Sequence, residues 1–438
     1  MYRLMSVLLM CCALTAHAAS DSTSDSTNDA TDKQVSDTQP EGYQAGYGDI
    51  PEFGGPDGVS GQLKQADRAD PSLFAWEAPE RWLKPWYDWK GRLQDKHGFA
   101  LGFYASVLGQ AASDTTTGDD EAVGVIHRFN GSWTLVNRGR KDPGRIEWRI
   151  EYRSRSLGQQ APMDLSAAVG AAAVNTGFPY TREFDADLSV LNWTQGFREE
   201  TIGVTAGRLA FDVYLDAMPF QTVAGGFLNR IFVLNPTIAT TGIGALGAVG
   251  RGFVGKNIIV GAQIYDGNAV NGDFDWDTFE EHEYLKAVDV AWVPSAARRK
   301  TDKIQFTYWA KDRREKAGVS SGHGWAVSAN WQVTEKLLPF VRFGHSNGGA
   351  GVAAETSLSG GFKYTVRPDQ AWTFGIGWAE PANRPSGTDN EIAVETSYEL
   401  KLAKNLSLLP DLQLIRNPAN NPTESSVWVV GLRVIVTL

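Results

Sequence analysis

The sequence has almost no cysteine, and its two cysteines, Cys11 and Cys12, both lie near the start. This start has a basic residue, Arg3, an apolar run over residues 4–16 and a small-x-small pattern at residues 16–18. These features predict a secretory signal peptide over residues 1–18, because a run of about 13 apolar residues is shorter than the roughly 20 that span a bilayer. A mature chain without cysteine excludes disulfides, thiol chemistry and cysteine metal sites.

Long apolar runs and excess positive charge are also missing. Beyond the signal, no stretch of about 18 uncharged apolar residues occurs, so we expect no membrane-spanning helix. Lys and Arg number 41 against 51 Asp and Glu, and loss of Arg3 leaves the chain one charge more negative than its formal −10. This acidic balance argues against a nucleic acid partner, which needs a basic surface.

Histidine is scarce as well, at six residues, of which His17 belongs to the signal. The others are scattered, with no pair at metal-ligand spacing: His97, His127, His282, His323 and His345. The sequence also lacks nucleophile-elbow, zinc-protease and P-loop motifs. Adjacency of His345 and Ser346 does not indicate a hydrolase, because the members of a catalytic triad meet in space. We therefore expect no enzyme, no metal and no cofactor.

Aromatic residues, in contrast, are abundant. The chain holds 15 Trp, 20 Phe and 13 Tyr, yet its mean hydropathy is −0.27. Many aromatic residues without long apolar runs are typical of a transmembrane β-barrel, in which only every second residue of a strand faces lipid.

The segment after the signal predicts little structure. Residues 20–39 are rich in Ser, Thr and Asp and poor in apolar residues, and residues 42–61 are rich in Gly and Pro. Such composition cannot bury enough apolar surface to fold. We expect a disordered acidic and Gly/Pro-rich leader over residues 19–78.

Residues 79–97 predict a short periplasmic helix. Trp82, Trp86, Trp89 and Leu93 recur at spacings of three and four, which places them on one helical face, and Pro85 would bend the helix or delay its start. We expect this helix to pack against the periplasmic end of a barrel; a plug or a peptidoglycan contact is the alternative.

From residue 98 onward the hydrophobic period is two, which predicts strands. The alternation is clear over residues 99–107, 129–135, 146–153, 304–311, 325–333, 358–367, 391–402 and 428–438. At roughly 20 residues for a strand and its connection, residues 98–438 predict an all-β, antiparallel barrel of about 16 strands. Residues 158–196 and 241–255 read as poor strands, and there we expect extracellular loops. A soluble sandwich also alternates, but aromatic residues near strand ends favour the membrane barrel: Trp133, Tyr152, Trp325, Trp331, Trp372 and Trp378.

Full charges occupy the polar face of these strands. In one strand Glu147, Arg149, Glu151 and Arg153 all project to the same side. In a dry core each charge would cost several kcal/mol in desolvation, whereas charges that line water can act as a selectivity element. We therefore propose this ladder as a pore lining; the alternative is that its charges only pair across strands.

Further residues on inward phases complete the set of candidate pore-lining or substrate-binding residues. They are Arg128, Trp309, Lys311, Lys363, Arg367, Glu395 and Glu399. The rings of Trp309 and Tyr104 could stack on the apolar face of a sugar, while arginine and carboxylate groups could bond to its hydroxyls. Both rings could equally fill space beneath an inward-folded loop.

An acidic stretch offers candidate calcium ligands, Asp273, Asp275 and Asp277. An EF-hand loop would need glycine and glutamate where Thr278 and Tyr284 stand. A solvated acidic loop is therefore favoured.

The C-terminal strands resemble the carbohydrate-selective porin family, the OprB-type outer-membrane porins. Residues 406–418 are similar to that family's L-x-L-x-P-D-L-Q-x-I-x-N-P strand and turn, and residues 430–433 to its closing G-L-R strand. Weaker similarities lie at residues 205–209 and 260–268. The final apolar row ends in Leu438, where such strands usually end in Phe.

The resemblance implies a 16-stranded barrel with inward-folded loops, through which glucose-like sugars diffuse passively. We expect an outer-membrane porin whose partners are small sugars and membrane lipid, as a monomer or homotrimer. A general or anion-selective ion porin without a sugar site is the first alternative. An outer-membrane lipase or an adhesin barrel is the second.

Overall fold

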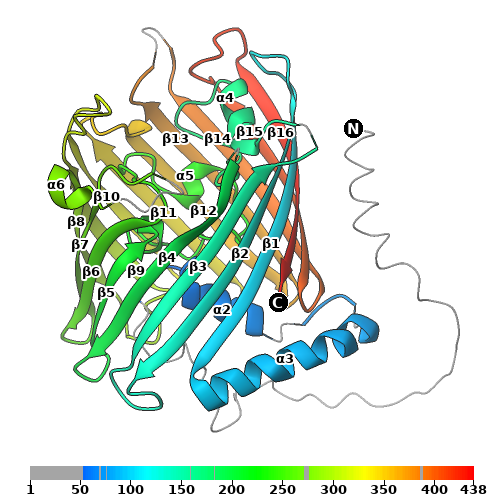
Figure 1. Cartoon of the computed structure of the whole chain (residues 1–438). Coiled ribbons are helices and arrows are strands. Elements are labelled where there is room, and N and C mark those ends of the chain that lie inside the picture. The colour runs from blue at the N-terminus through cyan, green and yellow to red at the C-terminus, as the bar shows by residue number, and fades with distance from the viewer. Residues whose placement is uncertain are drawn as a thin grey trace, which may run out of the picture. The chain divides into compact units, whose positions relative to one another are not determined.

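A computed structural model of the chain describes residues 53–438 except 69–70, 75, 158, 182, 271–275 and 385–387. The described residues form sixteen strands in one closed antiparallel barrel, in which each strand pairs with its sequence neighbours and β16 pairs with β1 (Figure 1). The strands are β1 (Phe99–Ala112), β2 (Glu121–Val136), β3 (Gly144–Arg155), β4 (Glu183–Phe197), β5 (Ile202–Leu209), β6 (Ala245–Val254), β7 (Ile258–Asp266), β8 (Tyr284–Trp292), β9 (Lys303–Lys311), β10 (Gly322–Asn330), β11 (Leu337–Ser346), β12 (Ala354–Arg367), β13 (Gln370–Pro381), β14 (Glu391–Ala403), β15 (Leu406–Arg416) and β16 (Ser426–Thr437).

The predicted barrel of about 16 strands is confirmed, and its outer face follows the predicted phase. On β9, for example, Ile304, Phe306 and Tyr308 are exposed, whereas Thr307 and Trp309 are buried. These outer apolar side chains are left exposed by the protein, as expected of a surface that faces lipid. The signal peptide and most of the leader lie outside the described residues.

Two regions expected to be loops also contain strands. The 158–196 region includes most of β4, and the 241–255 region includes β6. The strand β6 is rich in glycine, which has a low propensity for strands, so its sequence does not indicate a strand. Gly247 is nevertheless required there, because a Cβ at this position would lie 2.9 Å from the ring of Tyr265 on β7. A third difference is at β10, which ends at Asn330 and does not continue to Val333.

The connections differ in length between the two ends of the barrel. At one end they are short, such as residues 368–369 between β12 and β13 and residues 404–405 between β14 and β15. At the other end they are long, and the longest joins β5 to β6 over residues 210–244. Short turns face the periplasm in barrels of this type, so the start of β1 and the end of β16 lie on the periplasmic side.

Helices lie in the connections and before β1. They are α2 (Val59–Asp67), α3 (Glu77–His97), α4 (Pro162–Ala168), α5 (Arg230–Val233) and α6 (Thr278–Glu281), with a 3₁₀ helix η1 (Phe211–Val213). Among the described residues, none of these helices has the length and hydrophobicity needed to cross a bilayer.

The leader is more ordered than its composition predicts. The expectation of disorder is wrong for residues 59–67, because α2 places Val59 and Leu63 against Ala100 and Val213 inside the barrel. The helix predicted over residues 79–97 is found as α3, which begins at Glu77 and runs through Pro85. It ends at Gly98, whose φ of 65° is left-handed and whose N–H donates to the carbonyl of Gln94 at 2.8 Å.

Gly131 on β2 seats an aromatic residue of the outer face. It stands directly opposite Trp148 on β3, and a Cβ at Gly131 would lie 1.8 Å from the Trp148 indole. The Trp148 ring in turn contacts Phe99, with ring centroids 5.2 Å apart. The absence of a side chain at Gly131 therefore allows an aromatic cluster to form at the periplasmic rim.

We predict that Gly131→Val destabilises the barrel by about 1–3 kcal/mol, the usual cost of overpacking, because Trp148 must leave its seat. Gly250→Val is the matched control, since nothing lies within 4 Å of a Cβ at Gly250 on the outer face of β6. The urea concentration at which half of each variant is unfolded is measured on a gel, where the folded barrel migrates differently from the heated, unfolded chain. Equal urea midpoints for the two variants would show that the packing of Trp148 over Gly131 does not contribute to stability.

Candidate functional site in the barrel interior

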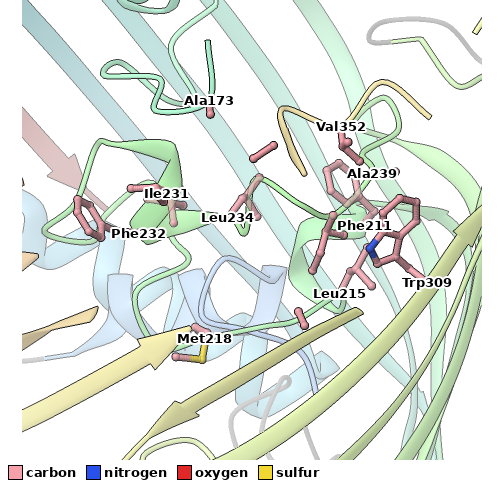
Figure 2. Close-up of a cluster of buried hydrophobic side chains, with 14 of the residues drawn as sticks. Ala173, Phe211, Leu215, Met218, Ile231, Phe232, Leu234, Ala239, Trp309 and Val352 are labelled. Atoms are coloured by element: carbon pink, nitrogen blue, oxygen red, sulfur yellow. The ribbon is translucent and has the colours of Figure 1, made fainter. Parts of the chain in front are cut away.

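Three segments fold into the barrel and cover much of its inner wall. They are residues 53–68 with α2, the β3–β4 connection with α4, and the β5–β6 connection with η1 and α5. The β5–β6 connection supplies apolar residues such as Phe211, Leu215 and Leu234 to a buried cluster (Figure 2). The interior is therefore a packed assembly with polar contacts at its edges.

Trp309 and Tyr104, the two candidate sugar-stacking rings, lie beneath the inward segments. Trp309 projects from β9 into the cluster that contains Phe211 and Leu215 (Figure 2). Tyr104 is buried on β1 and its hydroxyl donates to the carbonyl of Val223 at 2.9 Å. Both rings thus fill space under the β5–β6 connection, the second of the two roles that the sequence left open.

The ladder residues Glu147, Arg149, Glu151 and Arg153 project inward from β3 and are buried. Arg153 donates to Glu151 at 2.8 Å, and Arg128 on β2 donates to the same carboxylate at 2.9 Å. Glu147 and Arg149 contact Ser60 and Asp57 of residues 53–68, whereas Arg153 donates to the carbonyl of Pro179 in the β3–β4 connection at 2.8 Å. The charges of the ladder are compensated by close partners, as buried charges must be.

Asp57, just before α2, is the acceptor that joins these groups. Its carboxylate accepts two hydrogen bonds of 2.9 Å from Arg128 and one of 3.1 Å from the backbone N–H of Val223. Arg149 donates to the Asp57 carbonyl and lies 3.8 Å from its carboxylate. One buried side chain thereby connects the leader, the barrel wall and the β5–β6 connection.

Other inward candidates also hold the β5–β6 connection in place. Glu395 accepts hydrogen bonds from the backbone N–H groups of Leu228 at 2.5 Å and Asn229 at 2.9 Å. Lys311 donates to the carbonyl of Thr240 at 2.7 Å. A carboxylate on β14 and an ammonium group on β9 thus bind the middle and the final part of the same connection.

The remaining candidates lie near the periplasmic turns. Lys363 and Glu399 form an ion pair of 3.2 Å and keep part of their surface accessible. Arg367 is the last residue of β12 and is exposed beside the β12–β13 turn. These three residues stand apart from the network around Asp57.

A pocket of about 50 Å³ remains between residues 53–61 and the wall formed by β3 to β6. Glu147 and Arg145 line it from β3, Arg251 from β6, and Tyr214 from the β5–β6 connection. Glu147 accepts hydrogen bonds from Arg145 at 2.9 Å and from the hydroxyl of Ser60 at 2.6 Å. Of the four ladder residues, Glu147 is the one that lines this pocket.

Asp212 in η1 adds a titratable group beside the network. Burial, together with the negative charge of Asp57, raises the pKa of its carboxyl to about 6. The charge where the β5–β6 connection meets the leader therefore changes near pH 6.

Alternation identifies some interior residues and misses others. Arg145 and Arg433 continue the inward phases of β3 and β16, so extending those phases would have found them. Asp57 and Asp216 lie outside the strands, and Asp216 pairs with Arg342 at 2.5 Å. No local pattern marks such a residue as the partner of a distant wall arginine.

The structure does not bring together the residues considered for a hydrolase or a metal site. Ser346 is buried and donates to the carbonyl of Ala354, while His345 is exposed on the opposite face of β11. Asp273 and Asp275 lie outside the described residues. Within the described part of the chain, no group of three or more potential metal ligands is found.

Comparisons with known proteins agree with this architecture. Residues 294–438 match the family model described as carbohydrate-selective porin, OprB family, which confirms the resemblance seen in the C-terminal strands. Porin AaxA of Chlamydia felis is 23% identical over 328 residues, which cover 69% of this chain and 68% of that protein. Porin AaxA of Chlamydia abortus matches to the same extent.

A solved structure has the same fold. The high pH structure of Pseudomonas putida OprB superposes with a TM-score of 0.64 at 14% identity, covering 81% of this chain and 97% of that one. Together these likenesses support an outer-membrane porin, and they point to a channel and not to an enzyme.

We predict that Asp57→Ala loosens the interior and raises single-channel conductance in a planar bilayer. Loss of the carboxylate leaves Arg128 short of an acceptor inside the barrel, and breaking a buried pair costs about 3–5 kcal/mol. Asp88→Ala is the control, because Asp88 is an exposed residue of α3 that pairs with Lys84. Unchanged conductance in Asp57→Ala would show that this carboxylate does not hold the interior closed.

Proposed function

Because its C-terminal strands match the carbohydrate-selective porin family, we propose that this chain is a passive, sugar-selective porin for small sugars such as glucose. The observation that carries the proposal is the pocket at Glu147. It places a carboxylate, two guanidinium groups and an aromatic residue around one space.

This combination suits a neutral sugar better than an ion. A sugar hydroxyl both donates and accepts hydrogen bonds, so it can donate to Glu147 and accept from Arg145 or Arg251. The guanidinium groups have their own acid partners, Glu147 at 2.9 Å and Asp289 at 2.9 Å, which reduces the field felt by a mobile ion. Tyr214 offers an aromatic ring on which an apolar sugar face can pack.

Passage of a sugar requires the interior to move. The pocket volume of about 50 Å³ is well below the roughly 300 Å³ at which ligand pockets usually begin. Under this proposal, residues 53–68 or the β5–β6 connection shift to admit the solute. Arg149, Glu151 and Arg153 then act as supports of the closed arrangement, while Glu147 acts as a contact to the sugar.

One observation favours an anion-selective channel as the second candidate. Lys303 and Lys311 donate to the backbone carbonyls of Ala217 and Thr240, and neither forms an ion pair among the described residues. Their positive charges are therefore less completely neutralised than those of the arginines. Reversal potentials in a KCl gradient measure this preference directly.

We predict that proteoliposomes swell faster in glucose than in a neutral polar solute of similar size that is not a sugar. The reason is that the pocket supplies both hydrogen-bond donors and acceptors, which a sugar hydroxyl can use together. Equal swelling rates for the two solutes, together with strong anion preference, would favour the second candidate.

We also predict that Glu147→Gln weakens sugar-induced block of the ionic current, because the amide is a poorer acceptor than the carboxylate. Glu199→Gln is the control, since Glu199 pairs with Lys141 at an exposed periplasmic turn. If Glu147→Gln and Glu199→Gln bind sugar equally well, the pocket is not the sugar contact.

Arg153→Ala should alter conductance through the packing of the interior while the barrel stays heat-resistant on a gel.

A further inference from the structure

The helix α3 presents an unexplained face of tryptophan outside the barrel interior. At about 100° per residue, Trp82, Trp86, Trp89 and Leu93 form one stripe along its side. Trp82 is 70% exposed and Trp89 is 40% exposed, unusually high values for tryptophan. Trp86 and Leu93 are half-buried, so the stripe is covered by the protein only in part.

A different face of α3 makes the contacts with the protein. Lys90 is buried and pairs with Asp67 at the end of α2 at 2.8 Å, and Gln94 donates to the same carboxylate at 3.1 Å. The ammonium group of Lys404, on the β14–β15 turn, lies 4.2 Å from the ring centroid of Tyr87. These three contacts fix the rotation of the helix and leave the tryptophan stripe to one side.

The helix follows the periplasmic rim of the barrel (Figure 1). Just before it, the backbone N–H groups of Leu73 and Phe74 donate to the carbonyls of Lys401 at 2.9 Å and Leu402 at 3.1 Å. At its other end, the indole of Trp133 donates to the carbonyl of His97 at 3.2 Å. Both ends of α3 are thus tied to the wall, one at β14 and one at β2.

The tryptophan stripe continues the outer aromatic surface of the barrel. Trp133, which bonds the end of α3, lies on the lipid side of β2 beside Phe99, with ring centroids 6.0 Å apart. Before the helix, Phe74 is half exposed and stacks on Trp76, with ring centroids 5.9 Å apart. Exposed aromatic residues therefore lie before α3, along it and beyond its end: Phe74, Trp82, Trp89 and Trp133.

A third face of α3 is charged. Lys84, Asp88, Arg92 and Asp95 are exposed and lie away from both the tryptophan stripe and the face that contacts the barrel. One face of the helix contacts the barrel, a second is charged and a third carries tryptophan. These faces suit the three environments at a membrane rim: protein, water and lipid.

From this arrangement we infer that α3 lies in the headgroup layer of the periplasmic leaflet, with its tryptophan stripe inserted among the lipids. Tryptophan prefers this layer because one part of the indole is apolar and its N–H can bond polar headgroups. A helix with an aromatic face and a charged face binds in the plane of such an interface. The bilayer is therefore the partner of this surface, and α3 acts as a collar that anchors the rim.

The test uses single cysteines in the full chain with Cys11→Ala and Cys12→Ala. Trp82→Cys and Leu93→Cys place a polarity-sensitive fluorophore on the stripe, and Leu93→Cys leaves all three tryptophans in place. Asp88→Cys and Asp95→Cys place the same probe on the charged face. Each protein is reconstituted into phosphatidylethanolamine–phosphatidylglycerol vesicles with or without lipid that carries a nitroxide near its headgroup.

We expect probes on the stripe to emit at shorter wavelength and to lose severalfold more intensity to the nitroxide lipid than probes on the charged face. Iodide in water should quench the two pairs in the opposite order. Equal behaviour of the two pairs would overturn the inference. Protection that vanishes when the barrel is diluted in lipid would instead assign the stripe to a second copy, and protection that needs added peptidoglycan would assign it to the cell wall.

Discussion

The structure depends on the requirement that charge inside the barrel be paired, and Asp57 meets that requirement at the point where three parts of the chain converge. Its carboxylate binds Arg128 on the wall and the backbone N–H of Val223 in the β5–β6 connection, and it belongs to the leader that carries α2. An arginine buried without such an acceptor would be strongly destabilising. The residues 53–68 are therefore held in the interior by the same electrostatic need that the strands create.

Alternation was sufficient to predict the barrel because lipid imposes it on each strand separately. A residue such as Phe306 faces lipid whatever its neighbours are, so its phase can be read locally. The strand β6 was harder to recognise because it is rich in glycine, and the need for Gly247 comes from Tyr265 on the neighbouring strand β7, which the pattern of β6 itself does not show. The fold of residues 59–67 was missed for a related reason. A short, weakly apolar helix is stable there because the barrel supplies the surface that its own sequence lacks.

The site was predictable only in part. Inward phase correctly placed Glu147, Arg149, Glu151 and Arg153 on the inner wall. Phase cannot report what covers a wall residue, because the covering group comes from elsewhere: Asp57 is 71 residues away from Arg128 in sequence. The ladder was therefore expected to line water, whereas Arg149 binds Asp57 of the leader and Arg153 binds the carbonyl of Pro179 in the β3–β4 connection. Glu147 differs from its neighbours only because the leader leaves a gap beside it.

That gap links the closed interior to transport. The hydroxyl of Ser60, on α2, donates to Glu147 at 2.6 Å, and this is the bond that a sugar hydroxyl would make to the same carboxylate. Exchange of one hydroxyl for another preserves the number of hydrogen bonds at the charge, so its net free energy is small. A simple ion offers no such exchange, because it would have to separate Glu147 from Arg145. Under the proposed function, selectivity for hydroxyl-bearing solutes therefore follows from the way in which the leader closes the barrel. The hydroxyl of Ser60 on α2 occupies the position at Glu147 that a sugar hydroxyl would take.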